Sequence, residues 1–310
     1  MAFDIIGDIH GQSDKLRGLL AHMGYQERDG AYRHPNRSAI FVGDLIDRGP
    51  SQLDAVMTVR RMRDVGSAQV IMGNHEFNAI AWHTPNLARA GEFLRPRSGL
   101  LGRKNRAQHA EFLAEFEDNP ALHKEIVDWF LTLPLWLDLP DIRVVHACWH
   151  GGYMNELRPH LTAQLQLTPE LLVNASREGT MAFRAVECLT KGLEIGLPDG
   201  VSFTDKDGHP RRHVRLRWWD VDGNTYRALA LMPESLRKSL PDLPLDQDPR
   251  EPYDNTKPVF FGHYWMTGQP VLQSPAMACV DYSAAKDGPL VAYRWDGEKQ
   301  LNARNFVSAA

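Results

Sequence analysis

The chain has 310 residues, of which 43% are hydrophobic and 24% are charged, and its formal net charge is -4. These are ordinary values for a globular protein, and the mild negative charge argues against a nucleic-acid partner, which usually goes with a strong basic excess. Because no apolar run is long enough to span a bilayer and the N-terminus lacks the layout of a signal peptide, we expect a soluble, cytoplasmic protein without a membrane partner.

The first 72 residues alternate between strand and helix patterns. Three short apolar runs predict buried strands at residues 3–6, 39–42 and 69–72. Helical spacing of apolar residues predicts two helices between these strands, one beginning at Ser13 and one at Ser51. Strand, helix and strand at this spacing predict a largely parallel sheet.

The middle of the chain has a different pattern. Residues 77–135 predict a mostly helical insertion, interrupted by a Gly/Pro/Arg stretch at about 91–106. A strand follows at 142–145, and residues 160–195 are typical of helices. Residues 202–219 predict a hairpin that turns at Asp207-Gly208.

The C-terminal part predicts short strands and turns. Residues 240–258 are rich in Pro and Asp and indicate an irregular surface loop. The apolar runs 278–282 and 289–293 predict a hairpin. Since neither an internal repeat nor a clean linker is present, we expect one domain over residues 1–310.

The cysteines indicate the redox environment. Cys148, Cys188 and Cys279 are far apart in the sequence and form no CxxC pair. An odd and sparse set of this kind is typical of reduced thiols in a reducing compartment.

Three polar segments follow the three predicted strands of the first half. They are GDIHG at residues 7–11, GDLIDRG at 43–49 and GNHE at 73–76. Because ligands of open α/β sheets bind at the carboxyl ends of the strands, we expect the three segments to converge on one crevice. Their glycines allow sharp turns and close approach of the backbone to a ligand.

The side chains in these segments suit metal binding. Carboxylate, amide and imidazole ligands favour manganese, iron or zinc over soft-metal chemistry. Two metals roughly 3.5–4 Å apart need a shared ligand, and Asp44 has two carboxylate oxygens for that role. The segments therefore predict a site for two divalent metal ions, with manganese as the first choice and iron or zinc as alternatives.

The three segments together resemble the signature of the calcineurin-like metallophosphoesterases. More narrowly, they resemble the pattern GDxHG, GDxxDRG and GNHE of the phosphoprotein phosphatase branch, which includes the Ser/Thr protein phosphatases. The motifs match in order over residues 7–76, and two later histidines extend the resemblance loosely over most of the chain. The resemblance implies an α/β (α+β) four-layer sandwich, with two mixed sheets flanked by helices and a dinuclear metal site at one edge.

The resemblance also implies a set of metal ligands. Asp8 and His10 would hold the first metal, and Asp44 would bridge the two metals. Asn74 would bind the second metal through its amide oxygen. The family also has two later histidines, each after a strand, and His146 and His263 fit these positions.

The first of the later histidines has an alternative. His150, in an HGG sequence, resembles the form that protein phosphatases use, whereas His146 directly follows a predicted strand and is preferred here. After His263, the GHxH ending of many members of the wider family is absent. This departure favours the phosphoprotein phosphatase branch.

The resemblance implies a hydrolytic mechanism in which a hydroxide that bridges the two metals attacks phosphorus. Arg48 would grip two phosphoryl oxygens with its planar guanidinium group. His75 would protonate the leaving oxygen, and Asp47 would orient that imidazole and support its charged form.

Substrate contacts are predicted outside the motifs. The basic stretch 89–106, with Arg103 and Arg106, indicates either a clamp for additional phosphates or a solvated loop. Tyr264 and Trp265, directly after His263, are placed to touch a substrate.

The leading functional prediction is a metal-dependent phosphatase that hydrolyses phosphate monoesters such as phosphorylated Ser/Thr on proteins. The alternative is a symmetrical bis(5'-nucleosyl)-tetraphosphatase, which would act on a dinucleoside polyphosphate. A non-catalytic metal-binding module is the second alternative. For both enzymatic functions the expected partner is a phosphorylated substrate, either a phosphoprotein or a dinucleoside polyphosphate.

Overall fold

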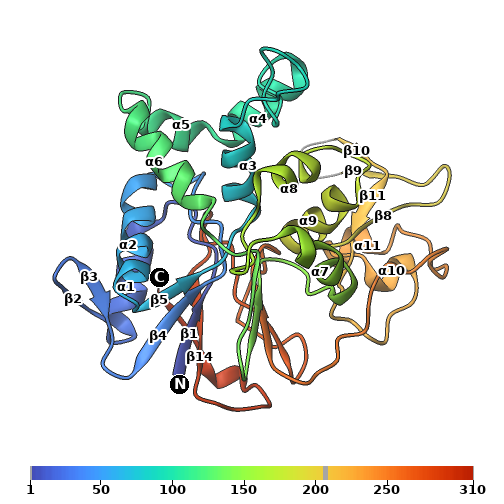
Figure 1. Cartoon of the computed structure of the whole chain (residues 1–310). Coiled ribbons are helices and arrows are strands. Elements are labelled where there is room, and N and C mark those ends of the chain that lie inside the picture. The colour runs from blue at the N-terminus through green and yellow to red at the C-terminus, as the bar shows by residue number, and fades with distance from the viewer. Residues whose placement is uncertain (1, 205–208, 310) are drawn as a thin grey trace.

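Two mixed β-sheets lie face to face at the centre of the computed structural model, which describes residues 2–204 and 209–309 (Figure 1). The larger sheet has the strand order β15-β14-β1-β4-β5. Its strands β1 (Ala2–Ile6), β4 (Arg37–Phe41) and β5 (Ala68–Val70) run parallel, as the sequence predicts. Strand β14 (Leu290–Trp295) pairs antiparallel with β1, and β15 (Phe306–Ala309) pairs antiparallel with β14.

The smaller sheet has the order β13-β12-β7-β6. Strand β12 (Val259–Phe261) is parallel to both β13 (Met277–Cys279) and β7 (Arg143–Val145), and β6 (Trp136–Asp138) is antiparallel to β7. The predicted C-terminal hairpin is wrong, because β13 and β14 belong to different sheets. Both segments are buried along almost their whole length, so an apolar pattern could not identify their neighbours.

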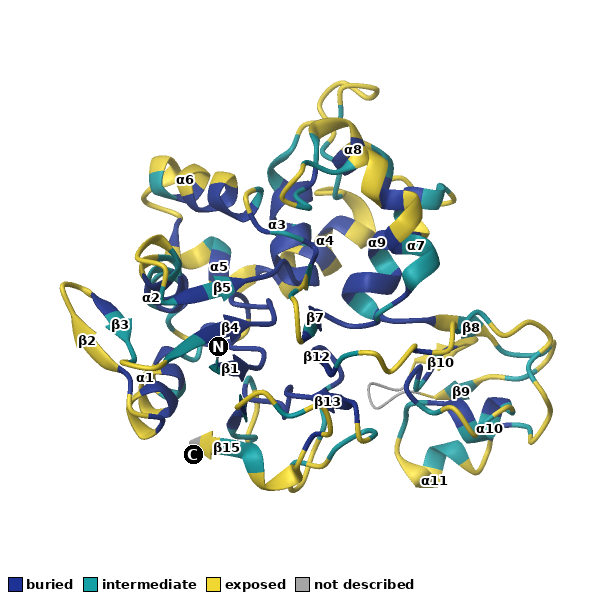
Figure 2. Cartoon of the chain, turned by 60° about the horizontal axis from the view of Figure 1, so that its bottom comes forward, coloured by how far each residue is buried: buried dark blue, intermediate teal, exposed yellow. Residues whose placement is uncertain are grey.

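The sheets pack through a shared apolar core. Ile5 and Ile40 of the larger sheet belong to the same buried cluster as Val144 and Phe260 of the smaller sheet. The rings of Phe260 and Tyr293 meet across the interface with centroids 5.1 Å apart. Figure 2 shows these central strands as buried and the outer helices as exposed on their far sides. This packing makes the two sheets one rigid support for the loops at their edges.

Helices cover the outer faces of the two sheets. Helices α1 (Ser13–His22) and α2 (Gln52–Asp64) lie against the larger sheet and begin at or next to the predicted residues. On the other side, Trp218 and Trp219 pack on Phe261 of the smaller sheet, with centroids 5.0 and 5.3 Å away. The helices of that side are α7 (Gly151–Leu157), α8 (Pro169–Ala175), α9 (Met181–Lys191), α10 (Tyr226–Leu229) and α11 (Glu234–Arg237). The layers therefore run helix, sheet, sheet, helix.

The segment between β5 and β6 is mostly helical, as expected for the insertion at about 77–135. The irregular part is shorter than predicted, because it ends at Ser98 and the basic stretch continues as a helix. The four helices of the segment are α3 (Asn74–His83), α4 (Gly99–Gln108), α5 (Ala110–Glu115) and α6 (Pro120–Phe130). Helix α3 packs against α6 and ties this segment to the sheets.

Small hairpins complete the fold. The pairs are β2 (Gln26–Arg28) with β3 (Ala31–Arg33), β8 (Glu194–Gly196) with β11 (His213–Arg215), and β9 (Phe203–Thr204) with β10 (Pro210–Arg211). Residues on both sides of the predicted turn pair as β9 and β10, while the turn at Asp207-Gly208 lies outside the described residues. Within the described ranges, no helix is long and apolar enough to cross a membrane. Cys148, Cys188 and Cys279 are buried free thiols.

Two histidines pack together inside the helical segment. The rings of His83 in α3 and His123 in α6 meet edge to face with centroids 4.1 Å apart, and His123 stacks on Phe116. Burial, followed by the neighbouring His123, lowers the pKa of His83 to about 3. Burial, followed by His109, lowers the pKa of His123 to about 4. Both imidazoles therefore stay neutral in the folded protein at pH values where they would be protonated in the unfolded chain.

This difference predicts acid sensitivity of the fold. Below about pH 6.5 the unfolded chain binds protons that the folded chain excludes, so the free energy of unfolding should fall as the pH drops toward 4. The slope contributed by each histidine approaches about 1.4 kcal/mol per pH unit. The variant His123→Phe keeps the ring and removes the titrating group, so its stability should fall less steeply in denaturant titrations between pH 7.5 and 5. Parallel curves for the two proteins would contradict this account.

Candidate active site

The loops after five strands meet at one edge of the two sheets. Asp8 and His10 follow β1, Asp44 follows β4, and Asn74 and His75 follow β5 as the first residues of α3. These strands are parallel, so their carboxyl ends lie together. The smaller sheet adds His146 after β7 and His263 after β12, which are also parallel to each other. The fold thus brings the motif residues and two distant histidines to the same place.

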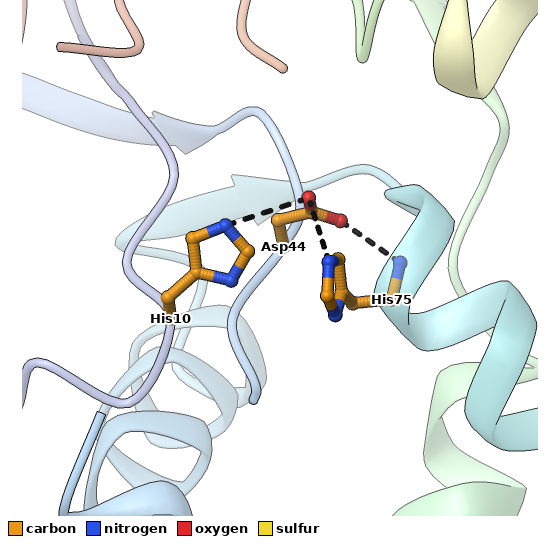
Figure 3. A group of neighbouring side chains, drawn as sticks. All are labelled: His10, Asp44 and His75. Atoms are coloured by element: carbon orange, nitrogen blue, oxygen red, sulfur yellow. Dashed lines mark hydrogen bonds and ion pairs between the residues drawn. The ribbon is translucent and has the colours of Figure 1, made fainter. Parts of the chain in front are cut away.

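The carboxylate of Asp44 lies at the centre of this arrangement. One of its oxygens, Oδ2, is 3.7 Å from His10 Nε2, 3.9 Å from His75 Nε2 and 3.3 Å from His146 Nε2. The other oxygen accepts the backbone N–H of His75 at 2.9 Å. Figure 3 shows Asp44 between His10, which comes from the loop after β1, and His75 at the start of α3.

The side chains form two groups that could each hold a metal ion. One consists of His10, Asp44 and His75, and the other of Asp44, His146 and His263, with the ligand atoms of each group within 4.8 Å of one another. Asp44 belongs to both, which is the placement that a bridging carboxylate requires. The predicted ligands Asp8 and Asn74 adjoin these groups: Asp8 Oδ2 accepts the backbone N–H of His263 at 3.0 Å, and Asn74 Oδ1 is 3.3 Å from His146 Nε2.

The buried polar atoms of the cluster fit two divalent metal ions. Among the described residues, Asp8 Oδ1, His10 Nε2 and both ring nitrogens of His263 are buried without a hydrogen-bond partner. Nδ1 of His10 lies 2.9 Å from the carbonyl of Ile46, and Nδ1 of His146 lies 2.6 Å from that of Val42. A proton donated from each Nδ1 leaves the Nε2 lone pair directed at the cluster, as in a metal-ligating histidine.

The structure distinguishes between the two candidate histidines after β7. His146 is fully buried and faces Asp44. His150 lies at the start of α7, where its Nδ1 accepts the backbone N–H of Tyr153 at 3.2 Å and its Nε2 lies 3.2 Å from the carbonyl of Pro249. His146 and not His150 therefore belongs to the cluster.

A second carboxylate, that of Asp47, links two histidines beside the cluster. Its Oδ2 is 2.5 Å from His75 Nδ1, and its Oδ1 is 2.6 Å from Nδ1 of His109. Burial opposes the ionisation of Asp47, but the hydrogen bonds from His109 and His75 outweigh it and lower its pKa to about 2. Burial likewise opposes the charged form of His75, while Asp44 and Asp47 outweigh it and raise the pKa of this imidazole. No motif in the sequence points to His109, which lies in the insertion between α4 and α5.

Glu76, the last residue of GNHE, joins two of the loops. Its carboxylate is completely buried and accepts the backbone N–H groups of Asp44 and Leu45 at 2.8 Å and of Gly73 at 2.9 Å. Burial, followed by the nearby Asp44, raises its pKa to about 7. Glu76 therefore positions the backbone of the Asp44 loop relative to α3, a role that the sequence analysis did not assign.

The loops of the site hold an uncommon backbone conformation. Non-glycine residues rarely adopt positive φ angles, because the side chain crowds the backbone there. Such a conformation persists only where the surrounding structure stabilises it. Six residues of the site have φ between 50° and 73°: His10, Asp44, Asp47, Arg48, His263 and Trp265. Close packing adds to the constraint, since a Cβ at Gly73 would overlap the Asp44 carboxylate and one at Gly262 would overlap that of Asp8.

A cleft of about 320 Å³ opens above the cluster, and we call it the central cleft. Four cationic side chains from separate parts of the chain line it, together with amides, the Asp47–histidine network and one indole. Its lining residues outside the motifs are Asn78, Arg95, Gln108, His109, Lys191, Arg215 and Trp265. Of the motif residues, Asp44, Asp47, Arg48, Asn74 and His75 reach it, and so does His263.

Of the residues predicted to touch a substrate, Trp265 lines the central cleft, whereas Arg103, Arg106 and Tyr264 lie elsewhere. Arg103 and Arg106 are exposed on α4 and do not line the central cleft; Arg106 lines a separate cavity beside Trp82. From the same basic stretch, Arg95 lines the cleft instead. Tyr264 is also outside the cleft. Its ring is buried against Trp219, with centroids 4.8 Å apart, because the positive φ angles on either side of it turn Tyr264 inward and Trp265 outward.

Comparison with known proteins agrees with this geometry. The calcineurin-like phosphoesterase family model matches residues 1–178, which is more than half of the chain. The chain therefore belongs to the calcineurin-like phosphoesterase family, a family of metallophosphoesterases.

Individual relatives have related names. The asymmetrical bis(5'-nucleosyl)-tetraphosphatase PrpE of Oceanobacillus iheyensis is 32% identical over 158 residues, 51% of this chain and 58% of that enzyme. The symmetrical bis(5'-nucleosyl)-tetraphosphatase of Vibrio vulnificus is 26% identical over 310 residues, 97% of each chain. A protein serine/threonine phosphatase from Saccharomyces cerevisiae superimposes with a TM-score of 0.52 at 14% identity, covering 100% of this chain and 79% of that one. This last likeness concerns the fold alone.

The buried contacts of Glu76 predict the effect of its replacement. In Glu76→Gln, the amide nitrogen would face a backbone N–H, so at least one buried donor loses its acceptor, which costs about 1–3 kcal/mol of stability. Metal content should fall with it, because the Asp44 loop is no longer fixed. Denaturant unfolding and metal analysis would measure both.

A matched control for this variant is Glu115→Gln. The exposed carboxylate of Glu115 also accepts two backbone N–H groups, those of Gln52 and Leu53 at the start of α2. Water can replace this acceptor, so a smaller loss of stability and no change in metal content are expected. Equal effects of the two variants would refute the positioning role of Glu76.

The pairing of His109 with Asp47 predicts a kinetic effect. In His109→Phe the ring that stacks on Phe112 is kept and the hydrogen bond to Asp47 is removed. Asp47 then orients His75 less firmly, so kcat should fall about 10-fold, which is part of the roughly 100- to 10,000-fold that a positioned acid or base contributes. KM and metal content should stay nearly constant. The control His123→Phe alters a buried histidine that does not contact Asp47 and should leave kcat unchanged. An unchanged kcat in His109→Phe would show that the hydrogen bond from His109 to Asp47 does not contribute to the reaction.

Proposed function

We propose that this protein hydrolyses dinucleoside polyphosphates, with symmetrical cleavage of a diadenosine tetraphosphate-like substrate as its main activity. The observation that carries the proposal is the ring of cations around the metal cluster. Arg48, Arg95, Lys191 and Arg215 all line the central cleft. One phosphoryl group bound at the cluster does not need four cationic side chains, whereas a chain of phosphates does.

The cations come from separate elements and face the cleft from different sides. Arg48 follows β4, Arg95 precedes α4, Lys191 ends α9 and Arg215 ends β11. Arg95 is held by a hydrogen bond of 2.8 Å to Gln108, and Arg215 by an ion pair of 2.9 Å with Glu194. Arg48 lies over the ring of Trp265 at 4.4 Å, which orients its guanidinium group. These contacts prepare the cations to bind an extended anion.

The relatives support the same class of substrate. Two of the similar proteins are named as bis(5'-nucleosyl)-tetraphosphatases, one asymmetrical and one symmetrical. The symmetrical enzyme aligns with 97% of this chain, and the asymmetrical one with 51%. The full-length alignment favours the symmetrical cut.

The residues of the chain suggest how the reaction proceeds. Metal ions held by Asp8, His10, Asp44, Asn74, His146 and His263, with Asp8 rather than His75 completing the group of His10 and Asp44, would activate water and neutralise phosphoryl charge. His75, whose Nδ1 is bound by Asp47, lines the cleft and would donate a proton to the leaving oxygen. Arg48 would bind the oxygens of the reacting phosphoryl group through its planar group.

The second candidate function is hydrolysis of phosphate monoesters, which is the leading prediction from the sequence. The observation in its favour is that Arg48, His75 and the metal cluster by themselves make up a site for a single phosphoryl group. A simple aryl phosphate should therefore also be a substrate, and a phosphoprotein would bind through the same group.

A comparison of substrates tests the proposal. With manganese supplied, diadenosine tetraphosphate should be converted to two nucleoside diphosphates with a higher kcat/KM than a phosphoserine/phosphothreonine peptide or an aryl phosphate. The variant Arg95→Gln should raise KM for the dinucleotide about 10-fold, as expected for loss of one charge-assisted contact to phosphate. It should change KM for the aryl phosphate less than twofold.

The control is Arg103→Gln, which removes a charge from the same basic stretch outside the cleft. It should leave both KM values unchanged. An equal effect of the Arg103 and Arg95 variants would support the sequence-based prediction of a basic clamp on α4. Preferred turnover of the phosphopeptide by the wild-type protein would refute the proposed function in favour of the protein phosphatase activity.

A further inference from the structure

A small apolar slot lies next to the central cleft. It has a volume of about 170 Å³ and shares Asn78, Arg95 and Lys191 with the cleft. A ligand in the slot would therefore lie next to a phosphate chain bound by the two shared cations. The slot is separate from the metal cluster, since none of the candidate ligands lines it.

The walls of the slot are mainly apolar and come from several parts of the fold, and Glu187, which also lines the slot, forms an ion pair with Lys191. Phe77 lies on α3, Leu101 on α4 and Phe183 on α9. Leu101 is 54% exposed, and Phe183 is half-buried. Single exposed apolar residues are common on protein surfaces, but here one of them lies at a cavity that also contains two aromatic rings. This combination is suited to stacking on a flat, aromatic ligand.

The size of the slot narrows the ligand further. An apolar cavity of about 150 Å³ accommodates benzene, so 170 Å³ is sufficient for one aromatic ring of that size. A fused second ring would project toward the opening. A polar group is also available at the wall, because Asn105 lines the slot and its Nδ2 donates to the carbonyl of Pro96 at 3.0 Å.

We propose that the slot binds one nucleobase of the substrate, while Arg95 and Lys191 bind the phosphates that connect this nucleoside to the metal cluster. The inference rests on the proposed function and names the part of the chain that recognises the nucleoside. An aromatic side chain of a phosphopeptide is the rival occupant. It is less favoured, because the two cations between slot and cluster have no partner in a ligand with a single phosphate.

The consecutive residues Leu100 and Leu101 offer a matched pair for the test. Both are exposed on α4, at 80% and 54%, but only Leu101 lines the slot. Their exposure means that Leu101→Ser and Leu100→Ser should both fold. Binding is measured through inhibition of aryl phosphate turnover by adenosine 5'-diphosphate and, separately, by inorganic pyrophosphate, with manganese in excess. These two inhibitors share a diphosphate and differ in the nucleoside.

The Leu101→Ser variant should raise the inhibition constant of adenosine 5'-diphosphate about 5- to 10-fold, consistent with partial loss of a stacking site for a base. It should leave the constant of pyrophosphate within twofold, and Leu100→Ser should change neither. An unchanged constant for the nucleotide, or equal changes for both inhibitors, would overturn the assignment of the slot. Weaker binding of an aromatic phosphopeptide, with nucleotide inhibition unchanged, would assign the slot to a peptide side chain instead.

This assay separates the inference from the proposed function. It uses aryl phosphate turnover, so it gives a result whether or not the dinucleotide is the preferred substrate. If the wild-type protein fails to hydrolyse diadenosine tetraphosphate, the proposed function is wrong even where the slot binds a nucleotide. If it hydrolyses the dinucleotide and Leu101→Ser behaves as Leu100→Ser does, only the slot is wrong.

Discussion

The buried carboxylate of Asp44 is the interaction on which the rest of the site depends. It is 1% exposed, and a buried charge of this kind is tolerated only where other groups compensate for the loss of water. Burial opposes its ionisation, but the imidazoles of His146, His75 and His10 outweigh that effect and hold its pKa well below the usual range. Its backbone is in turn held by Glu76, at a positive φ that an isolated loop would not keep. The packed sheets stabilise this strained arrangement, and the cluster, His75 and the central cleft are all positioned relative to it.

Much of the larger sheet and of the cluster can be predicted from the sequence. The strands β1, β4 and β5 are short apolar runs between helices of clear periodicity, and each is followed directly by a motif of glycines and polar residues. In such a unit the position of a residue after a strand determines where it lies in space. The resemblance to a known family, and not the strand pattern alone, points to His146 and His263, each of which follows a buried strand. His146 is preferred to His150 because it directly follows its strand, and the structure has His150 at the start of α7 instead.

The parts that could not be predicted depend on contacts between distant segments. His109 follows α4 in a stretch without any motif, and only the packing of the helical segment, with α5 on α2 and α6 on α3, brings it to Asp47. The residues that line the central cleft could not be predicted for the same reason. Arg95 and Arg103 belong to one basic stretch, and their different positions arise because the helix begins at Gly99, between them. Tyr264 and Trp265 are neighbours with opposite directions, which two positive φ angles determine and which no periodicity reveals. Strands β13 and β14 separate into two sheets for an equally non-local reason.

The order of the strands has a consequence for the synthesis of the protein. Strand β1 is paired on one side by β14, and Asp8 is hydrogen-bonded to His263, 255 residues later in the chain. At a translation rate of about 5–20 residues per second, the interval between these two residues is roughly 13–50 s. During this interval the nascent chain on the ribosome carries the first carboxylates and imidazoles of the site without the later strands that bury them. The cluster can close only after His263 has been synthesised, so any cation captured earlier is held by an incomplete and more exchangeable set of ligands.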